Sequence, residues 1–166
     1  MGERAKAERV QRHRHEADAE GLLRRPLGPV LSFMRSLWGL NHVLESTSRR
    51  MKARFGVTGP QRMVLRLVGR YPAISAGELA RLLRLHPSTL TAPLKRLVRR
   101  ELIARRVDPS DARRALFTLT PEGQELDKMR RNTVEAAVSA ILESLPPSDA
   151  RIAASVLDAL TTGMER

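Results

Sequence analysis

Residues 75–120 read SAGELARLLRLHPSTLTAPLKRLVRRELIARRVDPSDARRALFTLT. Ser75 and Glu78 stand three residues apart, the spacing of a capping box, and predict the start of a short helix over 76–83. After a short turn, a proline followed by Ser and Thr predicts the start of a second helix over 87–100. Two short helices joined by a tight turn are typical of a helix-turn-helix.

Beyond Glu101 the spacing of apolar residues changes from the helical period to alternation. Residues 102–107 and 115–120 are therefore predicted strands, and Asp108-Pro109-Ser110-Asp111 between them is turn chemistry. A β-hairpin directly after a helix-turn-helix is a wing. The sequence thus predicts a winged helix-turn-helix, in which the first helix supports the second and the second presents its N-terminal half to base edges.

Further helices are predicted on both sides of this segment. Residues 27–55 carry a wide apolar stripe that Gly56 ends, and Thr58 with Gln61 caps the helix that follows. Thr120-Pro121 is expected to begin one long helix that continues to Leu145, with a last helix after Pro146-Pro147. The predicted fold class is mostly α with a small β-hairpin.

The charge is strongly positive and unevenly distributed. The chain has 166 residues with 30 Lys+Arg against 18 Asp+Glu, a formal net charge of +12. Residues 84–114 hold nine Lys or Arg and three acids, which is half of the excess. This balance favours an anionic partner, either nucleic acid or a membrane surface, although a basic protein without such a partner has the same composition.

Several other classes are excluded or disfavoured. The absence of cysteine excludes disulfides and thiolate metal sites. No apolar run approaches ~18 residues, so a cytoplasmic protein is expected. No phosphate loop, nucleophile elbow or zinc-protease motif is present, so no enzyme and no cofactor are expected. His13 and His15 do not share a helix face, which argues against a metal site.

The second helix carries side chains suited to duplex DNA. Short hydroxyl side chains in its first turns can approach base edges, and the basic residues that follow can neutralise phosphates. In the hairpin, Asp111 is expected to hold the turn or orient an arginine, and Arg113 to enter a minor groove. The candidate DNA-contacting residues are Ser75, His86, Ser88, Thr89, Thr91, Lys95, Arg96, Arg99, Arg113 and Arg114.

These residues resemble a known family. The segments Ser88-Thr89-Leu90-Thr91, Leu94-Lys95-Arg96-Leu97 and Asp108-Pro109-Ser110-Asp111-Ala112-Arg113, followed by the run from Leu116 to Gly123, are similar to the MarR (multiple antibiotic resistance regulator) family. The resemblance covers about residues 27–162. It implies a homodimer with interlocked terminal helices that binds pseudo-palindromic operators, mostly as a repressor, with Arg113 as the minor-groove residue and residues 88–96 as the recognition helix.

The resemblance also implies a domain plan and an effector. It implies a dimerisation helix over 26–56, a DNA-binding lobe over 57–120 and dimerisation helices over 121–166, whereas the composition of residues 1–25, outside the resemblance, predicts a basic, mobile extension. Many family members release DNA when a small, often phenolic, ligand binds between arm and lobe. Candidate lining residues here are Met34, Trp38, His42 and Met63, although a lone Trp or His on an apolar helix is more often a packing residue.

The sequence leaves two other functions open. The chain could coat DNA without reading its sequence, or it could be a ligand-sensing or interaction module that has lost operator binding. A steep salt dependence without preference between duplexes would indicate the first of these. Pro93, inside the second helix, removes a backbone hydrogen bond and tends to kink the helix, so the sequence leaves open which residues beyond it face the groove.

Overall fold

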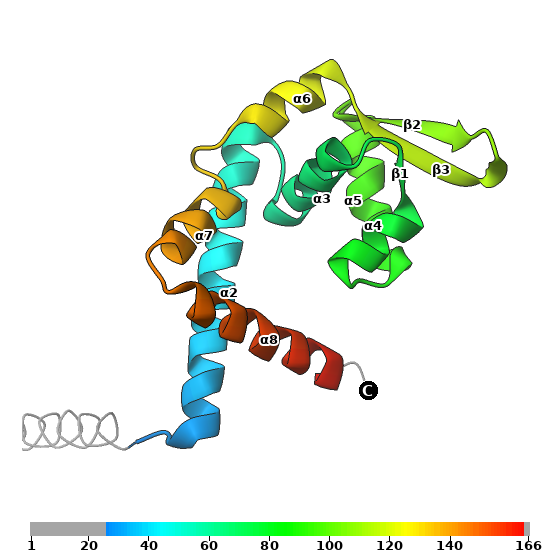
Figure 1. Ribbon diagram of the computed structural model, residues 1–166. Helices are drawn as coiled ribbons and strands as arrows, with labels where there is room; N and C mark the ends of the chain where they lie inside the picture. Colours follow the sequence, from blue (N-terminus) through cyan, green and yellow to red (C-terminus); the bar gives the residue numbers. More distant parts are fainter. Residues whose placement is uncertain (1–25, 165–166) are drawn as a thin grey trace, which may run out of the picture. The chain divides into compact units, whose positions relative to one another are not determined.

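The computed structural model describes residues 26–164 of the chain (Figure 1). The predicted extension over 1–25, with His13 and His15, lies outside the described residues. The elements in chain order are α2 (Gly28–Phe55), α3 (Gly59–Arg70), β1 (Ile74–Ser75), α4 (Ala76–Leu83), α5 (Pro87–Arg99), β2 (Ile103–Asp108), β3 (Asp111–Leu119), α6 (Pro121–Lys128), α7 (Val134–Glu143) and α8 (Pro147–Met164). The mostly helical fold class with a small sheet is thereby confirmed.

Local signals begin and end the helices of the lobe as the sequence predicts. Thr58 and Gln61 form a reciprocal capping box at α3, and Ser75 and Glu78 form another at α4. Gly56, with φ +71°, follows the last residue of α2 in the left-handed conformation that glycine adopts without strain. The side chains of the two capping boxes accept hydrogen bonds from backbone N–H groups that the start of a helix leaves without partners.

One apolar core holds α3, α4, α5 and the sheet together. Its centre is formed by side chains that are at most 2% exposed, namely Val57, Val64, Leu65, Val68, Leu79, Leu90, Leu97, Leu102 and Ile103. Figure 1 shows these helices gathered beside the sheet. Because every buried side chain of α5 belongs to this core, the opposite side of α5 is left exposed.

The sheet has three antiparallel strands in the order β1-β3-β2, so the prediction of a two-stranded hairpin alone was incomplete. The missing strand is Ile74–Ser75, which pairs with Phe117 and Leu116 of β3. A strand this short carries no alternation of its own. Its pairing with β3 depends on a contact across more than forty residues, which fixes the α4 N-terminus against the wing.

The prediction of one long helix from Pro121 to Leu145 is wrong. α6 ends at Lys128, Met129 has an extended backbone, Asn132 has φ +60°, and Thr133 caps a new helix, α7. The Thr133 hydroxyl accepts the Ala136 N–H at 3.2 Å. The apolar spacing continues across the interruption, which is why the sequence pattern did not reveal it.

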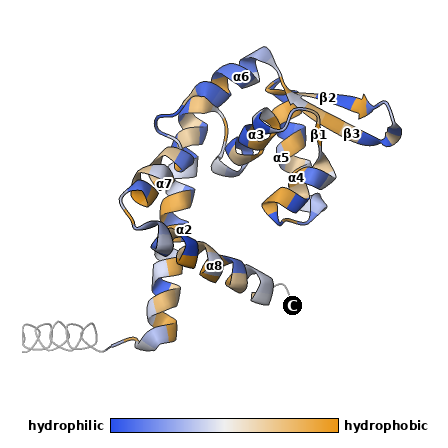
Figure 2. Cartoon of the chain, in the orientation of Figure 1, coloured by the Kyte–Doolittle hydropathy of each residue, from blue (hydrophilic) through white to orange (hydrophobic). Residues whose placement is uncertain are grey.

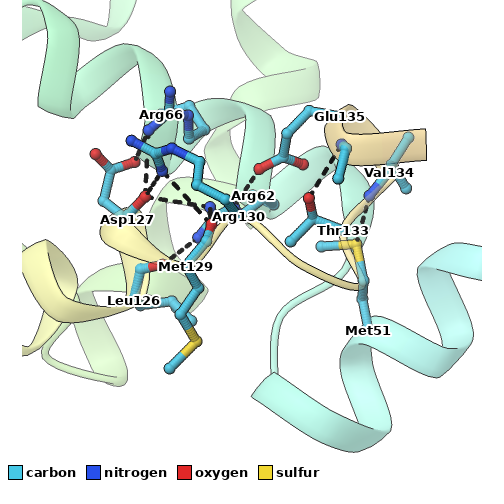
Figure 3. A network of polar contacts seen from close by, with 11 residues as sticks. Met51, Arg62, Arg66, Leu126, Asp127, Met129, Arg130, Thr133, Val134 and Glu135 are labelled. Carbon is cyan, nitrogen blue, oxygen red and sulfur yellow. Dashed lines mark hydrogen bonds and ion pairs between the residues drawn. The ribbon is translucent and has the colours of Figure 1, made fainter. Parts of the chain in front are cut away.

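A buried arginine lies at this interruption (Figure 3). Arg62 of α3 is 1% exposed and donates to the carbonyl oxygens of Leu126, Asp127 and Met129, and its Nε lies 2.7 Å from Oε1 of Glu135. The carbonyls at the end of α6 therefore find their partner in a side chain rather than in a continued helix. The interruption of the helix exposes the carbonyls that Arg62 needs as acceptors, and Arg62 supplies the donors that these carbonyls need.

The helices α7 and α8 contribute no buried residue. Both nevertheless contain apolar residues, coloured orange in Figure 2, and most of the large ones are exposed. The large exposed ones include Val138, Ile141, Leu142, Ile152, Val156 and Leu157, from 39% to 62% exposed. Residues 26–41, which form a separate unit, likewise expose Val30 and Trp38.

None of the described helices is long and apolar enough to cross a membrane.

Candidate nucleic-acid interface

The start of α5 is organised by His86. His86 is the N-cap residue, and its Nδ1 accepts the Ser88 N–H at 3.3 Å and lies 2.7 Å from the Ser88 hydroxyl. His86 therefore caps α5 through its side chain. Ser88 thus contacts the His86 ring at the start of the helix. The residue is exposed, so its hydroxyl is also accessible to a ligand.

The exposed side of α5 collects most of the candidate DNA-contacting residues. Leu90, Leu94 and Leu97 face the core, and they leave polar and basic side chains on the opposite side. Those exposed residues are Ser88, Thr89, Thr91, Lys95, Arg96 and Arg99. Despite Pro93, the helix is continuous from Pro87 to Arg99. The hydroxyl residues before Pro93 and the basic residues after it therefore lie on one uninterrupted helix.

The wing turn is fixed by two aspartates. Oδ1 of Asp108 accepts hydrogen bonds from the Ser110 N–H at 2.9 Å and from the Ser110 hydroxyl at 2.6 Å. Oδ1 of Asp111 accepts a hydrogen bond from the Arg113 N–H at 2.9 Å. Such side-chain acceptors are the usual means of holding a tight turn. The strand β3 already begins at Asp111, so Arg113 and Arg114 lie on the strand rather than in the turn, where the sequence had placed them.

Arg113 and Arg114 differ in their surroundings. Arg114 lies 3.5 Å from Glu78 and 3.7 Å from Asp108, whereas Arg113 is exposed and its side chain takes part in no ion pair among the described residues. Hydrogen bonds from Ser75 and then the charge of Arg114 lower the pKa of Glu78. Hydrogen bonds from Ser110 and then Arg114 lower the pKa of Asp108. Arg114 therefore ties the wing to α4, while Arg113 remains available for a ligand.

Ser75 lies apart from the exposed set. It is 7% exposed, its hydroxyl donates to Oε2 of Glu78 at 2.6 Å, and it caps α4. Its capping bonds already use the hydroxyl, so any contact with DNA would have to compete with them.

A hollow of about 500 Å³ lies between α5 and the wing. Its apolar floor includes Leu94, Val98 and Phe117, and its rim includes Thr91, Lys95, Arg99 and Arg105. Arg105 belongs to the charge excess over residues 84–114 but is not among the candidate DNA-contacting residues. Alternation along β2 could have identified it, because Arg105 is two residues after the buried Ile103 and therefore lies on the same face of the strand.

The four candidate effector-lining residues are distributed over the two units of the chain. Met34 is half-buried and Trp38 is 67% exposed in the unit that ends at Asn41. His42 is exposed and Met63 is 51% exposed in the unit that follows. Among residues 26–164, no group of His, Asp and Glu side chains is arranged to hold a metal ion.

The fold and this exposed basic helix define a winged helix-turn-helix protein. Residues 55–114 match the sequence model described as MarR family. The chain is 28% identical over 102 residues to the uncharacterized HTH-type transcriptional regulator YsmB of Bacillus subtilis, covering 61% of this chain and 70% of YsmB. It is 32% identical over 90 residues to the HTH-type transcriptional repressor Rv2887 of Mycobacterium tuberculosis, covering 54% of this chain and 65% of Rv2887.

Solved structures agree with this assignment. The fold is similar to MepR of S. aureus in its DNA complex, with a TM-score of 0.66 and 19% identity over 80% of this chain and 97% of MepR. It is also similar to overoxidized AbfR bound to DNA, with a TM-score of 0.62 and 25% identity over 80% of this chain and 93% of AbfR. The chain is therefore similar to winged helix-turn-helix regulators of the MarR family, in the sequence of residues 55–114 and in its fold.

Proposed function

We propose that this protein is a homodimeric transcriptional regulator that binds pseudo-palindromic double-stranded DNA in a sequence-specific manner and acts as a repressor. The observation that carries the proposal is the exposed side of α5, where hydroxyl residues precede a basic segment beside an exposed Arg113. The capped and packed helix presents this surface at a defined angle, because its other side is locked into the lobe core.

Each part of this surface suits a different part of a duplex. The side chains of Ser88, Thr89 and Thr91 are short enough for base edges in the major groove, where a methyl group can contact thymine and a hydroxyl can bond to bases. Lys95, Arg96 and Arg99 are long enough to reach phosphates on either side. Arg113, without an ion-pair partner among the described residues, is suited to a narrow minor groove.

The relatives support the proposal by their own properties. MepR and AbfR were solved with DNA, as was FabT of Streptococcus pneumoniae, and Rv2887 is named a repressor. The domain plan of an arm helix over 26–56, a lobe over 57–120 and C-terminal arm helices over 121–166 belongs to the same proposal.

The homodimer is supported by the unburied apolar side chains of α7 and α8. Contiguous exposed apolar surface on a monomer commonly marks an interaction site. Ile141 and Ile152, which are 61% and 62% exposed, gain a water-free environment only when another surface covers them. A second copy of the chain meets this need and at the same time places two reading helices on one duplex.

Selection of DNA fragments by the purified protein at near-physiological salt, followed by sequencing, tests the proposal. The expected result is a site with two-fold symmetry whose half-sites are centred about 10 bp apart. Fluorescence anisotropy then compares this site with a random duplex over a salt series. Equal affinity for both duplexes would indicate a DNA-coating protein, and no binding to either would indicate an interaction module.

We also propose that a small aromatic or phenolic effector releases the DNA, with Met34, Trp38, His42 and Met63 as its candidate contacts. Trp38 is the only tryptophan of the chain, so fluorescence excited selectively from tryptophan reports on its surroundings. Titration with salicylate should change this fluorescence and weaken operator binding over the same concentration range. A fluorescence change with unaltered DNA affinity would separate ligand binding from regulation.

A further inference from the structure

A second cationic surface lies outside the winged lobe. A cavity of about 640 Å³ is lined by the C-terminal part of α2, the segment between α6 and α7, and the first turn of α7. Its lining residues are Thr47, Arg50, Arg54, Arg130, Arg131, Asn132, Thr133, Ala136 and Ala137. We propose that this cavity, defined here as the arginine pocket, binds a small multiply charged anion that carries phosphate or carboxylate groups.

Three of the four guanidinium groups of the arginine pocket are held by neutral partners. Arg50 donates to the hydroxyls of Ser46 and Thr47, each at 2.9 Å. Arg54 lies over the ring of Phe55, 5.5 Å from its centroid. Arg130 donates to the backbone carbonyl of Asp127 (Figure 3). These contacts orient the side chains without neutralising their charge.

No acidic residue lines the arginine pocket. Nearby carboxylates are engaged elsewhere, since Asp127 pairs with Arg66 at 2.9 Å and Glu135 pairs with Arg62 at 2.7 Å. The ion pairs found among residues 26–164 include none of the four arginines of the arginine pocket. Four like charges around one cavity repel each other, and a bound anion would remove that repulsion.

The start of α7 adds to the same electrostatic field. Thr133, Ala136 and Ala137 belong to its cap and first turn, where the helix dipole is positive. A planar guanidinium can bind carboxylate or phosphate through two parallel hydrogen bonds. Arginines on two sides of a cavity therefore favour a ligand with several anionic oxygens over one with a single charge.

The concave form of the arginine pocket favours a free small anion over a DNA backbone. Its volume lies within the range of about 300–1,000 Å³ that is common for small-molecule sites. It shares no residue with the exposed side of α5 or with the wing. The inference therefore does not depend on the proposed operator binding.

Isothermal titration calorimetry of the full chain with pyrophosphate and with citrate, at constant ionic strength, tests the inference. We expect saturable binding with one site per protomer. The double variant Arg50→Gln/Arg131→Gln removes one arginine from each side of the arginine pocket and should weaken binding at least about tenfold, which corresponds to about 1.4 kcal/mol. Both residues are exposed, so the fold is expected to persist.

The matched control is Arg35→Gln/Arg151→Gln, which removes the same charge from exposed positions of α2 and α8. It should leave the anion affinity within about twofold. A second variant, Ala137→Glu, places a carboxylate of the chain's own in the arginine pocket and should abolish anion binding. Equal weakening in the two double variants, or the absence of saturable binding in the unmodified chain, would overturn the inference.

A duplex arm of the experiment distinguishes a free anion from a DNA phosphate. Affinity for a random duplex is measured for both double variants at the same ionic strength. The inference expects the two to lose affinity equally, because each loses the same charge. A selective loss in Arg50→Gln/Arg131→Gln, without loss of pyrophosphate binding, would assign the arginine pocket to DNA and overturn the inference.

Discussion

The winged lobe and the C-terminal helices use similar apolar side chains in opposite ways. Between Val57 and Leu126 they close a core, with Leu65, Leu79 and Leu97 at most 1% exposed. In α7 and α8 the same residue types bury nothing. The lobe buries its own apolar surface, whereas the C-terminal helices leave theirs exposed, as the proposed dimer requires. The types of apolar residue in a helix therefore do not reveal whether the folded chain buries them.

The joint between these two regions is polar. Arg62 connects the lobe to the end of α6 and to Glu135 of α7, and Met51 of α2 accepts the Val134 N–H at 3.2 Å through its sulfur. A charged side chain that is 1% exposed has few alternative arrangements, because each of its donors needs a partner. The arrangement of α7 relative to the lobe thus depends on directional bonds more than on apolar contact.

Removing the arginine of the joint should have the largest effect. In Arg62→Met, three carbonyls and the Glu135 carboxylate lose their hydrogen bonds from Arg62, and we expect a loss of roughly 3–5 kcal/mol in the free energy of unfolding. Urea unfolding followed by circular dichroism measures it. Arg66→Met is the control, because Arg66 is 35% exposed and its ion pair with Asp127 should contribute at most about 1 kcal/mol. Equal losses would show that the joint is not special.

The contrast between core and uncovered surface is tested by Leu97→Ala and Ile141→Ala. Leu97 is 1% exposed, and its truncation should cost about 2–5 kcal/mol at every protein concentration. Ile141 is 61% exposed, so its truncation should cost below about 0.5 kcal/mol in a dissociated protomer and more where dimers form. Unfolding measured at low and high protein concentration separates the two. Concentration-independent behaviour of both variants would contradict a dimer built on α7.

Removal of one arginine from the wing can be compared with removal of one arginine from α8. Arg113→Ala should weaken operator binding by roughly 1–3 kcal/mol, because it removes one specific contact. Arg151→Ala removes the same charge from an exposed position of α8 and should have a much smaller effect. Fluorescence anisotropy at fixed salt measures both affinities. If the two variants behaved alike, Arg113 would contribute only general charge.

The smallest effect concerns the titration of Glu135. Burial raises the pKa of this carboxyl, but the hydrogen bond from Arg62 and smaller favourable interactions outweigh it, so the pKa lies below its ordinary value of 4.5. Ionised Glu135 therefore stabilises the fold above about pH 4.5, and this stability is lost as the pH falls through the lowered pKa. The side chain is 37% exposed, so the contribution should stay below about 1 kcal/mol.

Glu135→Gln should remove this part of the pH dependence. Unfolding free energies measured between pH values above and below the ordinary carboxyl range give the comparison. An unchanged acid slope in Glu135→Gln would mean that the pair with Arg62 does not stabilise the folded state.

Much of the lobe could be predicted because its signals are local. Capping boxes at Thr58 and Ser75, the prolines at helix starts and the change from helical to alternating spacing near Glu101 each act within a few residues. The same local logic indicated which side of α5 is exposed. It placed Arg113 in the turn rather than on the strand, because a turn pattern does not reveal how far strand pairing extends.

The primary structure alone was sufficient for the helix-turn-helix, the wing and the position of the basic excess, since periodicity and caps are properties of neighbouring residues. Only the folded chain decided the pairing of Ile74 with Phe117, the interruption between α6 and α7, and the burial of Arg62. Each of these depends on groups distant in the chain, such as Arg62 and Glu135, 73 positions apart. A buried guanidinium is stable only where several acceptors converge, and that convergence is a property of three-dimensional packing.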